Sequence, residues 1–316
     1  MSRAIPFHLD VFSDLEATND VRRALSLPIK VSPELQVTHP LLLEYTNPND
    51  EYQLRPYQAQ ALQMIYNHHQ EMLREKEPTG IGAFINLGTG HGKFLVSMGI
   101  AKMVGAVRPL LIVPAPMLNT TIRESYKFEF LFPDLFHEDR LVMSVGELSQ
   151  AYTDEEKEQK AKKGRKTVAG IERVKEFAPD IIIVDEAQMF KDPNAARTLR
   201  LKRYLQENPG CALYILSATL ISKRVNDYAH LLALTMRGMS PLPFTRQAID
   251  AMQRKYDDSD DKNDTFGIFI RREFKDWSYM MLNEDSSFRA AIRKRVFTSQ
   301  LIYSSQGMSC PMDIEF

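Results

Sequence analysis

The chain has 316 residues, of which 44% are hydrophobic and 26% are charged, and its formal net charge is −1. This composition is typical of a globular protein with one large or two modest domains. The near-neutral charge excludes a global attraction to nucleic acid, so any such binding must come from local basic patches. The two cysteines, Cys211 and Cys310, lie in unrelated contexts, which argues against a disulfide framework and gives no metal-binding spacing.

The N-terminal residues lack the long apolar core of a signal peptide. No uninterrupted apolar run reaches the roughly 18 residues that a membrane span requires. We therefore expect a protein that is cytoplasmic, or inside a host cell, and that has no membrane partner.

Residues 1–50 form a predicted N-terminal extension, which three prolines divide into short extended pieces and to which we assign no chemistry. Leu54-Arg-Pro-Tyr-Gln58 then introduces a predicted helix that runs to about Arg74. Pro56 suits a first helical position, and apolar residues recur at helical spacing after it. We expect residues 51–240 to form the main domain.

A glycine-rich stretch follows the apolar run at residues 82–85 and precedes a segment of helical periodicity. Its residues are Gly88, Thr89, Gly90, His91, Gly92, Lys93 and Phe94. Strand, glycine-rich turn, lysine and helix is the context of a phosphate-binding loop, in which curled backbone N–H groups and a helix N-terminus face the phosphates. The alternative is a glycine-rich turn with a chance lysine. Phe94 stands where a Ser or Thr hydroxyl usually helps to hold Mg²⁺.

The next elements alternate between strand and helix. The run from Pro109 to Pro114 predicts a strand buried on both faces, a helix follows over about residues 117–131, and a strand over residues 140–145. Between residues 153 and 166 the sequence becomes strongly charged. Its basic cluster indicates either a solvated surface or a contact with nucleic-acid phosphates, and consists of Lys160, Lys162, Lys163, Arg165 and Lys166.

Asp185 and Glu186 directly follow the apolar run Ile181–Val184. At the carboxyl edge of a parallel sheet, the first acid can hold the water shell of a metal ion, and the second can orient an attacking water. The alternative is a pair of capping residues at the start of a helix. The phosphate-loop candidate upstream favours the catalytic interpretation.

A predicted helix over about residues 195–206 leads to another buried strand, residues 211–216, which ends in Ser217-Ala-Thr219. Two hydroxyls at a strand end can bond to the acidic cluster, although Ser and Thr there are usually turn formers. A further helix is predicted over about residues 225–236. Beyond it we expect a helical or irregular segment, residues 241–316, at the start of a second lobe that the chain does not complete.

Four features stand in order along the chain: Leu54-Arg-Pro-Tyr-Gln58, Gly88-Thr-Gly-His-Gly-Lys93, Asp185-Glu-Ala-Gln188 and Ser217-Ala-Thr219. Together they resemble the first RecA-like lobe of superfamily 2 helicases and translocases. The stretches Asp185–Asn194 and Leu216–Asn226, and the pair Arg271-Arg272, are similar to the Swi/Snf-type branch. The resemblance covers roughly residues 50–275. It implies an α/β fold, a P-loop NTPase lobe whose mostly parallel sheet carries helices on both faces.

The resemblance also implies roles for single residues. Gln58 is expected to bond the adenine, with Arg55 or Tyr57 nearby. The loop residues Gly88 to Phe94, with Lys93, are expected to bind ATP, while Asp185 holds Mg²⁺ and Glu186 positions the water. The residues expected to couple the nucleotide to a nucleic-acid track are Gln188, Ser217 and Thr219, and Pro114-Ala-Pro116 is expected to contact the track.

The leading hypothesis is thus the ATP-binding lobe of a nucleic-acid-dependent ATPase, with DNA favoured over RNA. We expect a second RecA-like lobe, on the same or another chain, to supply the arginine finger, which is worth on the order of 10³–10⁵ in rate in related NTPases. The alternative is a degenerate lobe that acts as a scaffold for nucleotide, protein or nucleic acid without turnover, and Phe94 favours it. A P-loop kinase is disfavoured, because Asp-Glu-Ala-Gln and Ser-Ala-Thr have no role in that chemistry.

Overall fold

The computed structural model of the chain describes residues 35–47, 52–74, 82–150, 170–218, 226–237, 240 and 302–304. Their centre is a six-stranded sheet of order β3-β2-β4-β5-β1-β6, in which every pairing is parallel. Its strands are β1 (Ala83–Asn86), β2 (Pro109–Val113), β3 (Leu141–Ser144), β4 (Ile181–Asp185), β5 (Ala212–Ser217) and β6 (Ile302–Ser304).

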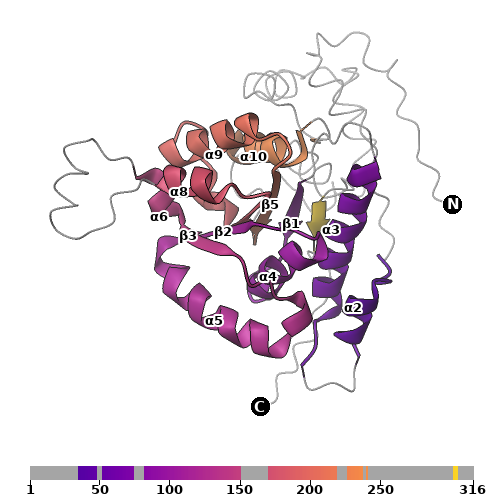
Figure 1. Cartoon of the computed structure of the whole chain (residues 1–316). Helices are drawn as coiled ribbons and strands as arrows, with labels where there is room; N and C mark the ends of the chain where they lie inside the picture. The colour runs from indigo at the N-terminus through magenta and orange to yellow at the C-terminus, as the bar shows by residue number, and fades with distance from the viewer. Residues whose placement is uncertain are drawn as a thin grey trace, which may run out of the picture.

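Helices cover both faces of this sheet (Figure 1). One layer contains α2 (Pro40–Glu44), α3 (Pro56–Arg74), α4 (Lys93–Met103) and α5 (Leu118–Leu131). The other contains α6 (Val145–Ser149), α8 (Gly170–Phe177), α9 (Ala196–Glu207) and α10 (Asn226–Met236). Three short 3₁₀ turns complete the described elements: η2 (Ala115–Met117), η3 (Pro133–Leu135) and η4 (Ala187–Phe190).

The central strands are apolar throughout because each of them is buried on both faces. Successive side chains of a strand point to opposite faces. Ile181, Ile183 and Tyr214 accordingly belong to the core cluster that α3, α4 and α5 cover. The alternate residues Ile182 and Ile215, also buried, face the layer of α8, α9 and α10.

The strand register brings the ends of β1, β4 and β5 to one edge of the sheet. Ser217 at the end of β5 lies opposite Asn86 at the end of β1, and Asp185 at the end of β4 lies opposite Leu216. Because all strands are parallel, the loops that leave these ends share the carboxyl edge, where open α/β sheets bind ligands. The predicted fold class is confirmed.

Several predicted elements agree with the structure within a few residues, and some differ for physical reasons. The predicted strand 140–145 ends at Ser144, because the Ser144 hydroxyl and the Glu147 carboxylate form a capping box that starts α6 at Val145. The predicted helix 117–131 begins with η2 and continues as α5 from Leu118. The helices α2 and α8 and the strand β6, which pairs with β1, were not predicted. The helix α2 begins at Pro40, where the sequence predicted an extended piece, because proline also suits the first position of a helix.

Other predictions fall outside the described residues. These are the basic cluster 160–166, Thr219, Arg271-Arg272, and the N-terminal and C-terminal segments apart from the ranges given above. The domain boundaries near residues 50 and 240 therefore stay predictions. Within the part of the chain that the structure describes, no helix is long and apolar enough to cross a membrane.

Candidate nucleotide site

The glycine-rich stretch forms a tight loop between β1 and α4. Leu87, directly after β1, donates its backbone N–H to the Ser217 carbonyl at 3.1 Å, which anchors the start of the loop on β5. Gly90 and Gly92 both have positive φ, 79° and 66°, a conformation that glycine adopts without steric cost. Gly92 caps α4, whose first residue is Lys93. The N–H groups of the first helical turn thus face the loop, as an anion-binding helix terminus requires.

Gln58 supports this loop from α3. Its side chain is 2% exposed, and its Nε2 donates to the His91 carbonyl at 3.0 Å. Its Oε1 accepts from the Arg55 backbone N–H at 2.8 Å. A Cβ on Gly92 would collide with the Gln58 amide, so glycine is required there by the neighbour as well as by φ. The structure therefore places Gln58 against the phosphate loop, and its contact with adenine stays a prediction.

Two aromatic rings pack against each other beside the loop. The Tyr57 and His91 rings lie with centroids 4.9 Å apart and planes 33° apart, and Arg55 Nη1 donates to the Tyr57 hydroxyl at 3.0 Å. The His91 ring also covers Gly88, where a Cβ would lie 3.0 Å from its Cε1. The bulky residue within the loop is thus accommodated because Gly88 has no side chain and Tyr57 offers a flat surface.

Lys93 meets the acidic end of β4. Its Nζ lies 3.5 Å from Glu186 Oε1, and the two side chains are 12% and 27% exposed. Glu186 has φ 64° and ψ 73°, the left-handed conformation, which is uncommon for a residue other than glycine. Such strained positions are frequent at functional sites. The sharp turn begins η4 directly after the strand, and Glu186 contacts Lys93 from this position.

A chain of polar contacts continues from Glu186 to β5. Gln188 Nε2 donates to Glu186 Oε2 at 2.6 Å, and the Ser217 hydroxyl donates to Gln188 Oε1 at 3.4 Å. Lys93, Glu186, Gln188 and Ser217 are therefore linked across the ends of three strands. This arrangement joins the loop lysine to the strand end that precedes Thr219, which is itself outside the described residues.

Asp185, at the end of β4, has a carboxylate oxygen whose hydrogen-bonding capacity is not met by the described residues. Its Oδ1 is buried and has no hydrogen-bond partner among the described residues. Burial, followed by the neighbouring Glu186 charge, raises the pKa of Asp185 to about 6, although Lys93 acts in the opposite direction. A buried carboxylate oxygen without a partner fits a hard cation such as Mg²⁺, which proteins usually bind through one or two carboxylates together with substrate phosphates.

Phe94 contributes packing at the position of the usual metal-side hydroxyl. Its ring is partly buried against the core that α3 and α4 share. Ser97, one turn further along α4, donates its hydroxyl to the Phe94 carbonyl at 2.8 Å and is thus directed at the helix backbone. In the described ranges, no group of three or more metal-binding side chains gathers at one place.

Two contacts that sequence reasoning missed hold the turn behind the acids. His230 on α10 donates Nε2–H to the Phe190 carbonyl at 2.8 Å, and Arg197 on α9 donates to the Met189 carbonyl. Both fix η4, the turn that carries Gln188. No sequence pattern marks either residue, because each contacts a backbone carbonyl from another element: Arg197 from the next helix and His230 from a helix 40 residues further along the chain.

Of the predicted site residues within the described ranges, the structure gathers the following at the carboxyl edge: Arg55, Gln58, Gly88, Thr89, Gly90, His91, Gly92, Lys93, Phe94, Asp185, Glu186, Gln188 and Ser217. A comparison with curated proteins found no match. A comparison with protein families found the type III restriction enzyme, res subunit, over residues 51–222. This match covers more than half of the chain and spans the loop, the acid pair and Ser217. The chain therefore belongs to the family of type III restriction enzyme res subunits, and its matched domain is a RecA-like lobe of the superfamily 2 helicase type.

Proposed function

We propose that this chain is the ATP-binding lobe of a nucleic-acid-dependent ATPase, a DNA translocase or helicase of the Swi/Snf-like kind. The observation that carries the proposal is the contact between Lys93 of the phosphate loop and Glu186 of the acid pair, 3.5 Å apart, beside the unpartnered oxygen of Asp185. If the lysine occurred in the turn by chance and the two acids served only as helix caps, there would be no reason for them to contact each other at the edge of the sheet.

The triphosphate is assigned to the loop. The N–H groups at the start of α4 face the phosphates, and Lys93 exchanges its contact with Glu186 for one with the outer phosphates. Gln58 holds the loop in shape through the His91 carbonyl. The partly exposed His91 ring packs on the buried Tyr57 ring next to the loop, and it is the surface on which we propose that an adenine stacks.

Asp185 is assigned as the metal ligand and Glu186 as the residue that orients the attacking water. Asp185 would hold Mg²⁺, which would neutralise charge on the outer phosphates. Glu186 is freed by the movement of Lys93 toward phosphate, and one of its oxygens then accepts a hydrogen bond from the water that attacks. Gln188 retains the other oxygen and holds the carboxylate in one orientation.

Gln188 and Ser217 are assigned to coupling. Because Ser217 bonds Gln188 and Gln188 bonds Glu186, a change at the γ-phosphate shifts the end of β5. The neighbouring segment Pro114-Ala-Pro116 at the end of β2 is the proposed contact with a DNA strand. A second RecA-like lobe, on the same or another chain, is the proposed source of an arginine finger.

Phe94 supports a second candidate function, a nucleotide-binding scaffold without turnover. Its ring fills the position of the metal-side hydroxyl and packs against the core. Calorimetry with ATP in the presence and absence of Mg²⁺ separates the two functions. Affinity that depends on the metal supports the ATPase, and affinity that does not depend on it supports the scaffold.

The proposal predicts that Lys93→Ala and Glu186→Gln each lower nucleic-acid-stimulated ATP turnover by about 100-fold or more, because each removes a group that stabilises charge or orients water in the transition state. Lys102→Ala is the matched control, since Lys102 lies in the last turn of the same helix. Turnover is measured with and without a second RecA-like lobe. Full turnover in either site variant would show that this edge is not the hydrolytic site.

A further inference from the structure

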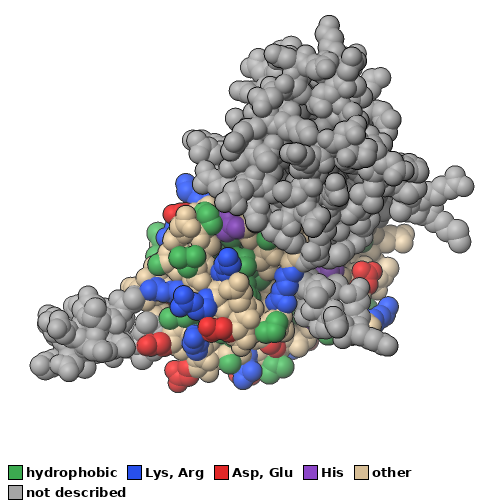
Figure 2. All heavy atoms as spheres, turned by 90° about the horizontal axis from the view of Figure 1, so that it is seen from above, with side chains coloured by type: hydrophobic (Ala, Val, Ile, Leu, Met, Phe, Trp, Pro, Cys, Tyr) green, Lys and Arg blue, Asp and Glu red, His purple; other side chains and the backbone are tan. Residues whose placement is uncertain are grey.

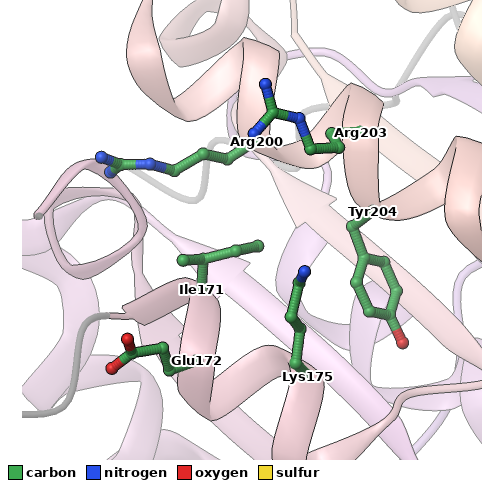
Figure 3. A pocket seen from close by; sticks show the side chains of 6 residues that line it. All are labelled: Ile171, Glu172, Lys175, Arg200, Arg203 and Tyr204. Carbon is green, nitrogen blue, oxygen red and sulfur yellow. The ribbon is translucent and has the colours of Figure 1, made fainter.

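A second charged site lies between α8 and α9, on the helix layer across the sheet from α4. It is a cavity of about 270 Å³ with a mixed lining, shown in Figure 3: Ile171, Glu172, Lys175, Arg200, Arg203 and Tyr204. Tyr204 forms part of its floor, and its hydroxyl donates to the Pro179 carbonyl at 3.2 Å. The charged side chains of the lining are Glu172, Lys175, Arg200 and Arg203.

The two helices that form the rim carry an excess of positive charge. Within their bounds they hold six basic and three acidic side chains. Lys175 is balanced by Glu207, whose Oε2 lies 3.2 Å from its Nζ, and Arg173 is balanced by Glu147. Arg200 donates to the Leu148 carbonyl and has no ion pair among the described residues, although the acidic side chain of Glu172 lines the same cavity. Arg203 has an exposed side chain and no ion pair within the described residues.

The positively charged groups on the rim of the cavity do not point at one common position. In Figure 3 the Arg200 and Arg203 side chains extend in different directions from α9, while the Lys175 amine points into the space between the helices. Arg200 and Arg203 are three residues apart and therefore neighbours on one helix face. Diverging guanidinium groups suit successive phosphates of a polymer, whereas a small anion needs donors that converge on one point.

Basic side chains also occur elsewhere on this side of the molecule. In Figure 2, which views the molecule from above Figure 1, Lys and Arg side chains are interspersed with Asp and Glu side chains. In the sequence, the five basic residues between Lys160 and Lys166 precede the start of α8 at Gly170.

We propose that the α8–α9 rim binds the phosphate backbone of a nucleic acid, as a contact separate from the strand path at the carboxyl edge of the sheet. The identity of the polymer rests on the proposed function. The contact is electrostatic and independent of base sequence, since the rim offers guanidinium and ammonium groups that match phosphates. It adds affinity and orientation for a segment of duplex that flanks the motor site.

The test is the salt dependence of binding to a short, labelled DNA duplex, measured by fluorescence anisotropy with the full chain and no nucleotide. Each phosphate contact contributes about 0.9 to the slope of log Kd against log salt concentration. Arg203→Gln is expected to lower that slope by about 1 and to weaken binding several-fold at about 100 mM salt. Arg200→Gln is expected to lower the slope in the same direction, as a second variant at the neighbouring cation of α9.

Arg123→Gln is the matched control, because Arg123 is a 73% exposed arginine side chain on α5, in the opposite helix layer. The proposal is wrong if the rim variants, folded by circular dichroism, keep the slope of the unsubstituted chain, or if Arg123→Gln changes it equally. It is also wrong if inorganic phosphate stabilises the chain through Arg203 while the duplex slope stays unchanged, since the cavity is then a small-anion site. The assay contains no ATP, so a failure of ATP turnover does not alter its outcome.

Discussion

Asp180 directly precedes β4 and Asp185 is its last residue, and the two carboxylates differ in how many hydrogen bonds they accept. Asp180, before the strand, accepts backbone N–H groups of Val107 and Arg108 on its two oxygens, at 2.6 and 2.9 Å. Asp185, at the carboxyl end, has a buried Oδ1 without a partner in the described ranges and a pKa raised to about 6. One acid fastens the loop before β2 to the sheet. The other is held in an environment that disfavours its charge.

Under the proposed function, this difference separates a carboxylate that holds the fold together from one that holds a metal ion. A hydrogen-bonded acid contributes to the stability of the fold, whereas a buried carboxylate oxygen without a partner costs stability. The two residues have the same side chain and belong to the same strand region, so their contrast cannot come from composition. It comes from the edge of the sheet at which each residue lies.

The largest expected effect is on catalysis. Asp185→Asn is expected to lower ATP turnover by about 100-fold or more, because the neutral amide removes the one protein carboxylate assigned to the metal. Asp180→Asn is its matched control, since the same substitution at the other end of β4 leaves the carboxyl edge unchanged. Turnover is measured for both variants at a temperature where both are folded. If both variants lost ATP turnover equally, the position of the acid at one or the other end of β4 would not explain its role in catalysis.

The next effect is on stability, and the two substitutions are expected to act with opposite signs. Asp180→Asn loses an acceptor for a backbone N–H and is expected to lower the free energy of unfolding by about 1–2 kcal/mol. Asp185→Asn is expected to raise it by about 1–3 kcal/mol at pH 7, because it removes a charge that burial disfavours. Both values come from denaturant unfolding in the absence of nucleotide.

The pH dependence of the Asp185 effect follows from its raised pKa. Below its ordinary pKa of 3.8, Asp185 is protonated in the folded and unfolded states, and the charge costs nothing. Between about 4 and about 6 the folded state holds the extra proton, so stability from this group falls as the pH rises, and the full cost is present above about 6. The gain from Asp185→Asn should therefore disappear near pH 4. A gain that is independent of pH would assign it to packing instead of charge.

Much of the fold could be predicted from the sequence because its strands are buried on both faces. The runs at residues 109–113, 181–184 and 212–216 are apolar without interruption, and each leads to a helix or a turn. The capping box at Ser144 was also visible as a Ser and a Glu three residues apart, and it would have corrected the end of β3. The strand β6 has three residues and pairs with a strand near the other end of the chain, a contact that no local pattern contains.

The site also has features that the sequence predicts and features that it does not. The loop, the acid pair and Ser217 could be found because their order and residue types carry the chemistry, and the parallel register then explains why they meet. The left-handed backbone of Glu186 and the unpartnered Asp185 oxygen depend on three-dimensional packing and could not be predicted. The α8–α9 rim was missed for a related reason, since its basic residues are spread over two helices and become one surface only when the helices pack.

The smallest expected effect concerns Phe94 and sharpens the assignment of Asp185. If Asp185 alone supplies the protein oxygen for the metal, a hydroxyl restored at position 94 should add a second oxygen. Phe94→Ser is therefore expected to bind ATP with Mg²⁺ about fivefold more tightly than Phe94→Ala, a difference of about 1 kcal/mol. The alanine variant is the proper reference, because both substitutions remove the same ring from the core and lose similar packing. Calorimetry with and without Mg²⁺ measures the difference, and a serine advantage that persists without the metal would assign the hydroxyl to the phosphates and not to the ion.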